Sequence, residues 1–193
     1  MREPYDTVLI VCEGAKTEPF YFRGLRSSYR LSNANILITP AEGTDPVSIV
    51  KFAEQRVSQY DRTYCVFDRD THPNYGAAIQ RAANSKPGIG GKLMAITSVP
   101  CFELWLLLHY RYSTAPIVAS KGKSPGGIAE KELTRHIPKY KKGDENIFEI
   151  VNPLYQTALG NAKALHKHSV ETASDNPHTR VYELVEYLRQ LKP

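Results

Sequence analysis

Three acidic side chains follow two apolar runs of the sequence. Glu13 comes directly after residues 8–12 (VLIVC), and Asp68 and Asp70 follow residues 63–67 (TYCVF) as a D-x-D. Clustered carboxylates repel one another and lose hydration unless a positive charge joins them. A hard divalent cation such as Mg²⁺ takes oxygen ligands and keeps waters for substrate phosphates, so such a site can clamp a phosphodiester and activate a water. The residue types favour this chemistry, although acids that cap helices or lie in solvated turns are the alternative.

The elements that must position these acids alternate along the first part of the chain. We expect strands at residues 8–12, 35–39, 63–67 and 92–97, and helices at 17–28, 45–59 and 74–84 and from Pro100 onward. This alternation predicts an α/β fold with a mainly parallel four-stranded sheet flanked by helices. Chemistry in such folds gathers at the carboxyl ends of the strands. If the first and third strands are neighbours, the three acids converge.

The composition changes after Tyr112. Residues 113–127 (STAPIVASKGKSPGG) are rich in Ser, Pro, Gly and Lys, which is typical of a loop. Helical segments are expected at 129–137, 153–168 and 178–191. We therefore predict an α/β catalytic core over residues 1–112, with residues 113–193 forming a loop and helices packed on it in one globular unit.

Bulk properties narrow the class of protein. The chain has 193 residues, a formal net charge of +5 and a pI of about 9.0, a balance compatible with a polyanionic partner. No apolar run approaches the ~18–20 residues that span a bilayer, and the first residues do not resemble a signal peptide. Cys12, Cys65 and Cys101 lack CxxC spacing, which favours reduced thiols over a zinc site. We expect a cytoplasmic protein that does not contact membranes.

Further candidate residues lie close to the three acids in sequence. Glu103, in the first turn of an apolar helix, is a further metal or substrate ligand, or a charge that complements the helix dipole. Lys16 follows the Glu13-Gly14 turn and is placed to neutralise a phosphate. His72 is a candidate proton donor to a leaving oxygen. Arg69, between the aspartates, either contacts a phosphate or offsets their charge.

Two basic residues farther along the chain are candidate phosphate contacts. Lys163 lies on a predicted helix, where a solvated face is the alternative. Arg180 falls at a predicted helix start, where backbone N–H groups favour anions. Glu18, also near a helix start, is assigned to the helix dipole.

Four blocks of sequence resemble a known family. They are LIVCEGAKTEPFYF (9–22), VFDRDTHPNY (66–75), VPCFELWLLLHY (99–110) and NPHTRVYELVEYL (176–188). They are similar to the TOPRIM domain of primases, topoisomerases and OLD-type nucleases. The closer resemblance is to the RloB-like family, small TOPRIM-like proteins linked to restriction and phage-defence loci.

The resemblance implies a Rossmann-like TOPRIM core and a nuclease that depends on Mg²⁺ or Mn²⁺. It makes Glu13 a general acid/base or metal ligand, and Asp68 and Asp70 metal ligands, acting on DNA or RNA. Members of the family are often encoded beside an ATPase, so an ATPase partner is implied too. This chain has no GxxxxGK[ST], so ATP hydrolysis would come from that partner.

Two other functions compete with the nuclease. In the first, the TOPRIM-like site is catalytically idle, and the chain is a binding or regulatory module that docks on an ATPase or senses a phage component. The second is nucleotidyl transfer, as in primases, which ranks last because the chain has no zinc-binding segment and is short for template handling. The sequence leaves the oligomeric state open.

Overall fold

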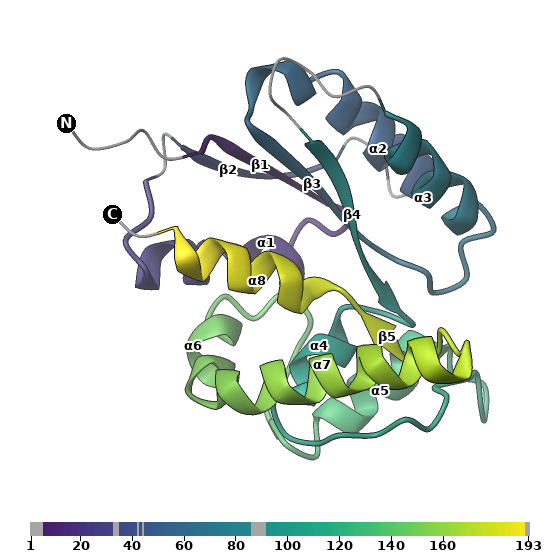
Figure 1. Cartoon of the computed structure of the whole chain (residues 1–193). Coiled ribbons are helices and arrows are strands. Elements are labelled where there is room, and N and C mark those ends of the chain that lie inside the picture. The colour runs from purple at the N-terminus through teal and green to yellow at the C-terminus, as the bar shows by residue number, and fades with distance from the viewer. Residues whose placement is uncertain (1–5, 33–34, 42, 44, 86–91, 192–193) are drawn as a thin grey trace.

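The computed structural model describes residues 6–32, 35–41, 43, 45–85 and 92–191. Within these residues a five-stranded sheet has the order β2-β1-β3-β4-β5 (Figure 1). The strands are β1 (Val8–Cys12), β2 (Ile36–Pro40), β3 (Arg62–Asp68), β4 (Lys92–Val99) and β5 (His178–Thr179). The first four are parallel, and β5 runs antiparallel to β4. The carboxyl ends of β1 and β3 therefore lie side by side.

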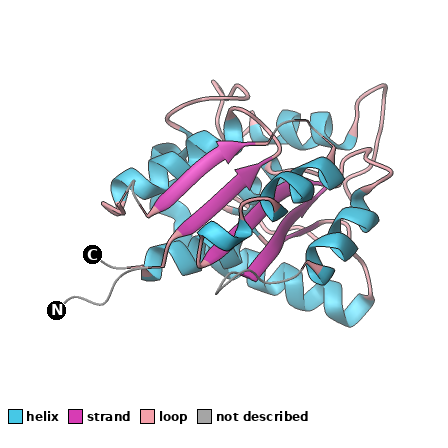
Figure 2. Cartoon of the chain, turned by 90° about the horizontal axis from the view of Figure 1, so that it is seen from above, coloured by secondary structure: helices cyan, strands magenta, loops and turns pink. Residues whose placement is uncertain are grey.

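Helices cover both faces of the sheet (Figure 2). The α-helices are α1 (Thr17–Ser28), α2 (Pro46–Glu54), α3 (Tyr75–Asn84), α4 (Glu103–Leu108), α5 (Pro125–Leu133), α6 (Ile147–Val151), α7 (Tyr155–Thr172) and α8 (Val181–Gln190), with 3₁₀ turns η1 (Val57–Gln59) and η2 (Asn152–Leu154). Buried residues of α2 and α3 pack on one face, and those of α1 and α8 pack on the other. The expected α/β class and mainly parallel sheet are confirmed.

The central strand β1 shows why its sequence forms this layer. All five of its residues are buried. Val8, Ile10 and Cys12 join the core on the α1 side, while Leu9 and Val11 join the core on the α2 side. A strand buried on both faces needs apolar side chains at every position, which explains the continuous VLIVC run.

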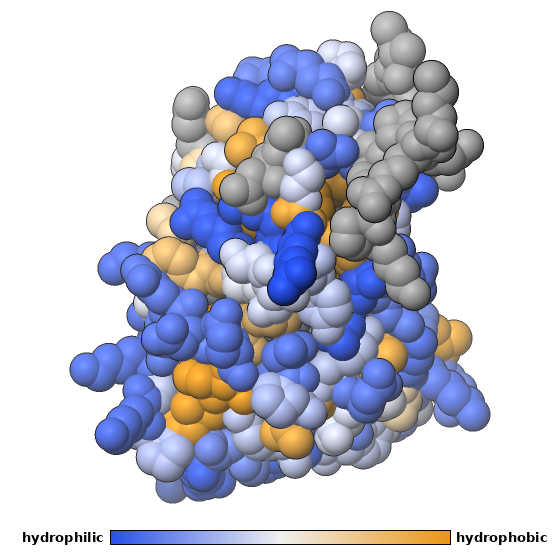
Figure 3. Space-filling model, turned by 90° about the vertical axis from the view of Figure 1, so that its left-hand side faces the viewer, coloured by the Kyte–Doolittle hydropathy of each residue, from blue (hydrophilic) through white to orange (hydrophobic). Residues whose placement is uncertain are grey.

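Helices α4, α5, α6 and α7 form a helical layer below the sheet in Figure 1. At its centre is α4, whose six residues are all buried, with Trp105 fully enclosed. A helix that is apolar all round is buried on every side. The face drawn in Figure 3 is largely hydrophilic, with its hydrophobic side chains in small separate patches. None of the helices described is both long and apolar enough to cross a membrane.

The structure differs from the sequence expectations in three places. A fifth strand, β5, occupies the start of the helix expected at 178, because two residues paired to Ser98 and Val99 are too few to show a period-two pattern. Helix α5 begins at Pro125, since Ser124 Oγ caps it by accepting from Gly127 N at 3.1 Å. Helix α6 was not expected. Residues 86–91 (KPGIGG), whose Gly and Pro content predicts a turn, lie outside the described residues.

Candidate functional site

A cleft of about 580 Å³ opens at the carboxyl ends of β1 and β3. Its walls also include the start of α4, the first turn of α5 and the residues that follow β1. The acidic side chains among its described lining are Glu13, Glu18, Asp68, Asp70, Glu103 and Glu130, and the basic ones are Lys16 and Lys142. The sequence-predicted acids are therefore brought to one hollow.

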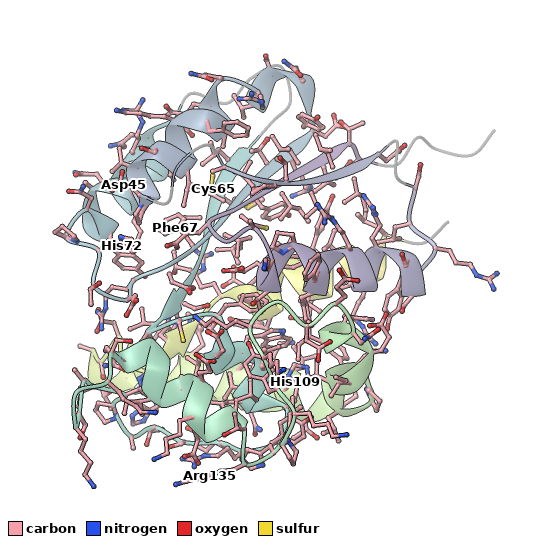
Figure 4. The ribbon with its side chains drawn as sticks, turned by 180° about the vertical axis from the view of Figure 1, so that it is seen from behind. Asp45, Cys65, Phe67, His72, His109 and Arg135 are labelled. Atoms are coloured by element: carbon pink, nitrogen blue, oxygen red, sulfur yellow. The ribbon has the colours of Figure 1, made fainter. Side chains whose placement is uncertain are left out.

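Glu13 ties the ends of the two strands together. Its backbone N–H donates to Val66 O at 2.9 Å, and its Oε2 accepts from the backbone N–H of Asp68 at 2.8 Å. Its Oε1 lies 2.9 Å from Nε2 of His72, a contact that is an ion pair when the imidazole is protonated. Figure 4 shows His72 beyond the end of the strand that carries Phe67. Both oxygens of the Glu13 carboxylate thus have partners.

Asp68 and Asp70 occupy different parts of the cleft. Asp68 is the last residue of β3, and its Oδ2 accepts from the N–H of Phe102 at 3.0 Å. Burial raises its pKa well above the usual range, and the negative charges of Glu18, Glu103 and Glu13 add to the effect. Asp70 is exposed and has a φ of 30°, a left-handed conformation that aspartate tolerates better than most residues.

Glu103 is the most buried acid of the cleft. It begins α4, and its side chain accepts from the hydroxyl of Tyr140 at 3.1 Å. Nζ of Lys142 lies 3.5 Å from the same Oε1. Only 2% of Glu103 is exposed. A charge this deep requires such partners, so Glu103 interacts with Tyr140 and Lys142 in addition to the helix dipole.

Glu18 is the acid that the sequence reasoning missed. It is the second residue of α1, and 9% of it is exposed. Burial raises its pKa to about 7, and the carboxylates of Glu103 and Glu13 contribute. Side chains in a first helical turn point back toward the helix start, which here is the Glu13-Gly14 turn. A Cβ at Gly14 would clash with the Glu18 carboxylate. That Glu-Gly turn directly before a helix is the signal that would have found it.

A basic segment, residues 138–146, folds over one side of the cleft. The N–H of Gly143 donates to Thr17 Oγ1 at 3.0 Å. Gly143 has a φ of +79°, and a Cβ there would lie 2.8 Å from Cδ of Lys16, so glycine is needed. Burial lowers the pKa of Lys142, but the nearby acidic groups, of which Glu103 contributes most, together outweigh this effect and the net shift is upward. The sequence alone did not place this lysine among the acids.

The remaining predicted residues are divided between the cleft and other ion pairs. Lys16 lines the cleft. Arg69 pairs with Asp175, which joins the D-x-D loop to the segment before β5. Lys163 pairs with Glu186 at 2.7 Å, and Arg180 pairs with Glu183 at 2.7 Å. Lys163 and Arg180 do not line the cleft and already have carboxylate partners.

Sequence comparison extends across this whole architecture. A family model described as RloB-like protein matches residues 8–188, from the start of β1 to within α8. The chain belongs to the RloB-like family. No curated protein and no solved structure matched it.

The cleft of this RloB-like protein has the residue types of a metal site without a preformed set of ligands among its described residues. In the part of the chain that the structure describes, no three His, Cys, Asp or Glu side chains are arranged to hold a metal ion as they stand. Glu13 and Asp68 instead accept from backbone N–H groups. The donor set is nevertheless that of a hard cation, since several carboxylates share a buried space and two of them have raised pKa values. In residue type and burial the set fits Mg²⁺ or Mn²⁺.

Proposed function

We propose that this RloB-like protein is a metal-dependent nuclease of the TOPRIM type, working in a phage-defence or restriction-associated system with an ATPase partner. The observation that supports this most is the convergence of Glu13, Asp68 and Glu103, with Glu18, in one cleft at the ends of parallel strands. Burying carboxylates that repel one another costs folding stability, and this cost supports a functional role for them. The Rossmann-like, TOPRIM-type core is part of the proposal.

Glu13, Glu18, Asp68 and Glu103 are the residues we propose to hold Mg²⁺ or Mn²⁺, with Asp70 at the exposed wall. A bound cation of this kind polarises a phosphoryl oxygen and lowers the pKa of bound water. Their shared burial supports the assignment, because burial and then repulsion between the carboxylates raise the pKa values of Glu18 and Asp68, and a bound cation would offset both effects.

Two lysines of the cleft, and a histidine that contacts one of its acids, have proposed roles in handling substrate and protons. Lys16 and Lys142 provide positive charge for a phosphate beside the carboxylates. His72, in contact with Glu13, is placed to exchange a proton with it or with a leaving oxygen. The proposed substrate is a phosphodiester bond in DNA or RNA.

One observation favours a second function, an idle TOPRIM-like module that binds an ATPase or a phage component. The described side chains form no ready metal cage, and Glu13 and Asp68 are engaged by backbone groups. An idle module would keep this arrangement and bind no divalent ion. Metal binding is therefore the property that separates the two functions.

The test is incubation of the full chain with plasmid DNA and with total tRNA, in Mg²⁺, Mn²⁺ or EDTA, with and without an ATPase encoded beside it. We expect cleavage only with a divalent ion, and its loss in Glu13→Gln and Asp68→Asn variants that unfold at the same temperature as the wild type or higher. Cleavage that persists in both variants would remove these residues from the mechanism. A stable complex with the ATPase and no turnover under any condition would favour the idle module.

A further inference from the structure

A second groove, of about 400 Å³, continues from the carboxylate cleft across α5. Its lining is Lys123, Ser124, Gly127, Glu130, Lys131 and Thr134. Ser124, Gly127 and Glu130 line the cleft as well. The two hollows are therefore one continuous surface, which leads from the acids to the exposed side of α5.

The sign of the charge changes along this surface. The cleft is acidic, whereas the groove carries Lys123 and Lys131 and one acid, Glu130, at the junction. Glu132, the next acid of α5, pairs with Arg111 and Arg135 instead. Among the described ion pairs none includes Lys123 or Lys131. Two lysines that form no ion pair with a described residue thus line a groove that adjoins the acidic cleft.

The backbone that carries Lys123 is held in one shape. Ser120 and Lys123 exchange N–H···O=C hydrogen bonds of 3.2 and 3.0 Å, closing a tight turn in which Gly122 has a φ of +74°. Ser124 then caps α5, and Pro125 fixes its first turn. A lysine on such a turn loses less backbone freedom on binding than one on a loose loop.

The first turn of α5 lies against the acidic wall. A Cβ at Gly126 would lie 3.9 Å from Oδ1 of Asp70 and 3.8 Å from Sγ of Cys101. The groove therefore begins next to Asp70, the exposed aspartate of the cleft. A ligand that binds at the carboxylates and extends past Asp70 comes close to the positive charges of Lys123 and Lys131.

A nucleic-acid strand carries several phosphates in a row, so it requires a positively charged surface next to the acidic cleft. A cation among the carboxylates compensates one phosphate, but the adjoining phosphates of the same strand would still face acids, and protein cations supply most of the affinity for nucleic acid. We propose that the groove over α5 binds the phosphates next to the scissile one, so that the ligand is a nucleic-acid strand rather than a mononucleotide. This inference rests on the proposed function, because that function places the scissile phosphate at the carboxylates.

The test measures binding of a fluorescein-labelled single-stranded oligonucleotide to the full chain by anisotropy, in EDTA and over a series of KCl concentrations. The variant is Lys123→Ala with Lys131→Ala. The matched control is Lys51→Ala with Lys167→Ala, which removes the same charge from exposed positions on α2 and α7. We expect about tenfold weaker binding for the groove variant, and a slope of log K against log salt that is smaller by about 1 to 1.5, from ~0.7 per phosphate contact. The control should bind within about twofold of the wild type.

The binding assay tests the groove, and the cleavage assay tests the nuclease proposal independently of it. Equal affinity and slope in the groove variant and the control would overturn the inference, as would a wild type that binds no oligonucleotide, and metal-dependent cleavage would be judged on its own assay. Groove-dependent binding in a protein that never cleaves would support the groove and end the nuclease proposal. An AMP competitor that displaces the oligonucleotide at equal concentration would also overturn the inference, since a strand must then gain nothing from the groove.

Discussion

The Glu13 carboxylate accepts a hydrogen bond from the backbone N–H of Asp68, with Oε2 and N 2.8 Å apart. The side chain at the end of β1 is thereby fixed to the last residue of β3. The strand register prepares this contact, because Cys12 is paired with Val66. The carboxylate of Glu13 is thus held beside Asp68 by the backbone, and two carboxylates buried together are unfavourable unless a proton or a cation joins them.

Neutralising Glu18 should stabilise the apo protein and remove part of its response to metal. In EDTA at pH 8, we expect Glu18→Gln to unfold at a higher temperature than the wild type, because one buried negative charge beside Glu103 and Glu13 is removed. Addition of Mn²⁺ should raise the melting temperature of the wild type more than that of the variant. The control is Glu171→Gln, at an exposed position, which should change neither the melting temperature in EDTA nor its increase with Mn²⁺. An equal Mn²⁺ response in wild type and Glu18→Gln would show that Glu18 is not a ligand.

Tyr140→Phe tests whether Tyr140 positions Glu103. The variant removes one hydroxyl that donates to a buried carboxylate, a bond worth roughly 1.5–3 kcal/mol. We expect a loss of unfolding free energy in that range, together with a several-fold lower kcat and a nearly unchanged KM. Tyr112→Phe, at an exposed tyrosine, should leave all three quantities unchanged. If stability falls while kcat stays at the wild-type value, Tyr140 supports the fold only.

The layer of strands could be predicted from the sequence because its signal is local. β1 is a continuous apolar run, and α1 was expected over the residues that form it, 17–28. The acids Glu13, Asp68 and Asp70 could be placed because parallel strands bring their carboxyl ends to one edge.

The environment of those acids could not be predicted from the sequence, since it depends on contacts between distant segments. Gly143 donates to Thr17 across 126 positions of sequence, and this contact, with the hydrogen bond from Tyr140 to Glu103, holds Lys142 beside Glu103. Glu18 was assigned to the helix dipole because acids at helix starts are usually solvated, and nothing in the sequence indicates that its side chain is buried beside Glu103 and Glu13. The two-residue β5 carries no periodic signal at all.

Lys142 is expected to compete with a divalent cation for the same carboxylates. In Lys142→Met the positive charge 3.5 Å from Glu103 is absent, so Mn²⁺ should bind the free protein several-fold more tightly, as measured by isothermal titration. Cleavage should nevertheless fall by about tenfold, because the phosphate loses a compensating charge. Lys141→Met changes the adjacent lysine, which is exposed, and should alter neither quantity. Weaker Mn²⁺ binding in Lys142→Met would contradict competition.

The buried His109 should make the folding stability of the protein fall at acidic pH, independently of the cleft. It is 1% exposed, and burial lowers its pKa to about 4, although the carbonyls of Trp105 and Leu106 partly oppose the shift. The folded pKa lies below the ordinary value of about 6.5, so the neutral imidazole stabilises the fold above pH 6.5 and this stability is lost as the pH falls toward 4. The loss amounts to roughly 3 kcal/mol at 1.36 kcal/mol per pKa unit. Figure 4 places His109 in the helical layer, away from His72.

The measurement is the free energy of unfolding by urea at several pH values between 7 and 4, in wild type and His109→Gln. We expect the wild type to lose stability more steeply than the variant over this interval. Only in the wild type does unfolding expose an imidazole that then binds a proton. His168→Gln, on α7, is the matched control and should follow the wild-type curve. Parallel curves for wild type and His109→Gln would mean that other groups, such as the carboxylates of the cleft, govern the acid transition. The comparison is made in EDTA, so that release of a metal from the cleft at low pH does not enter the slope.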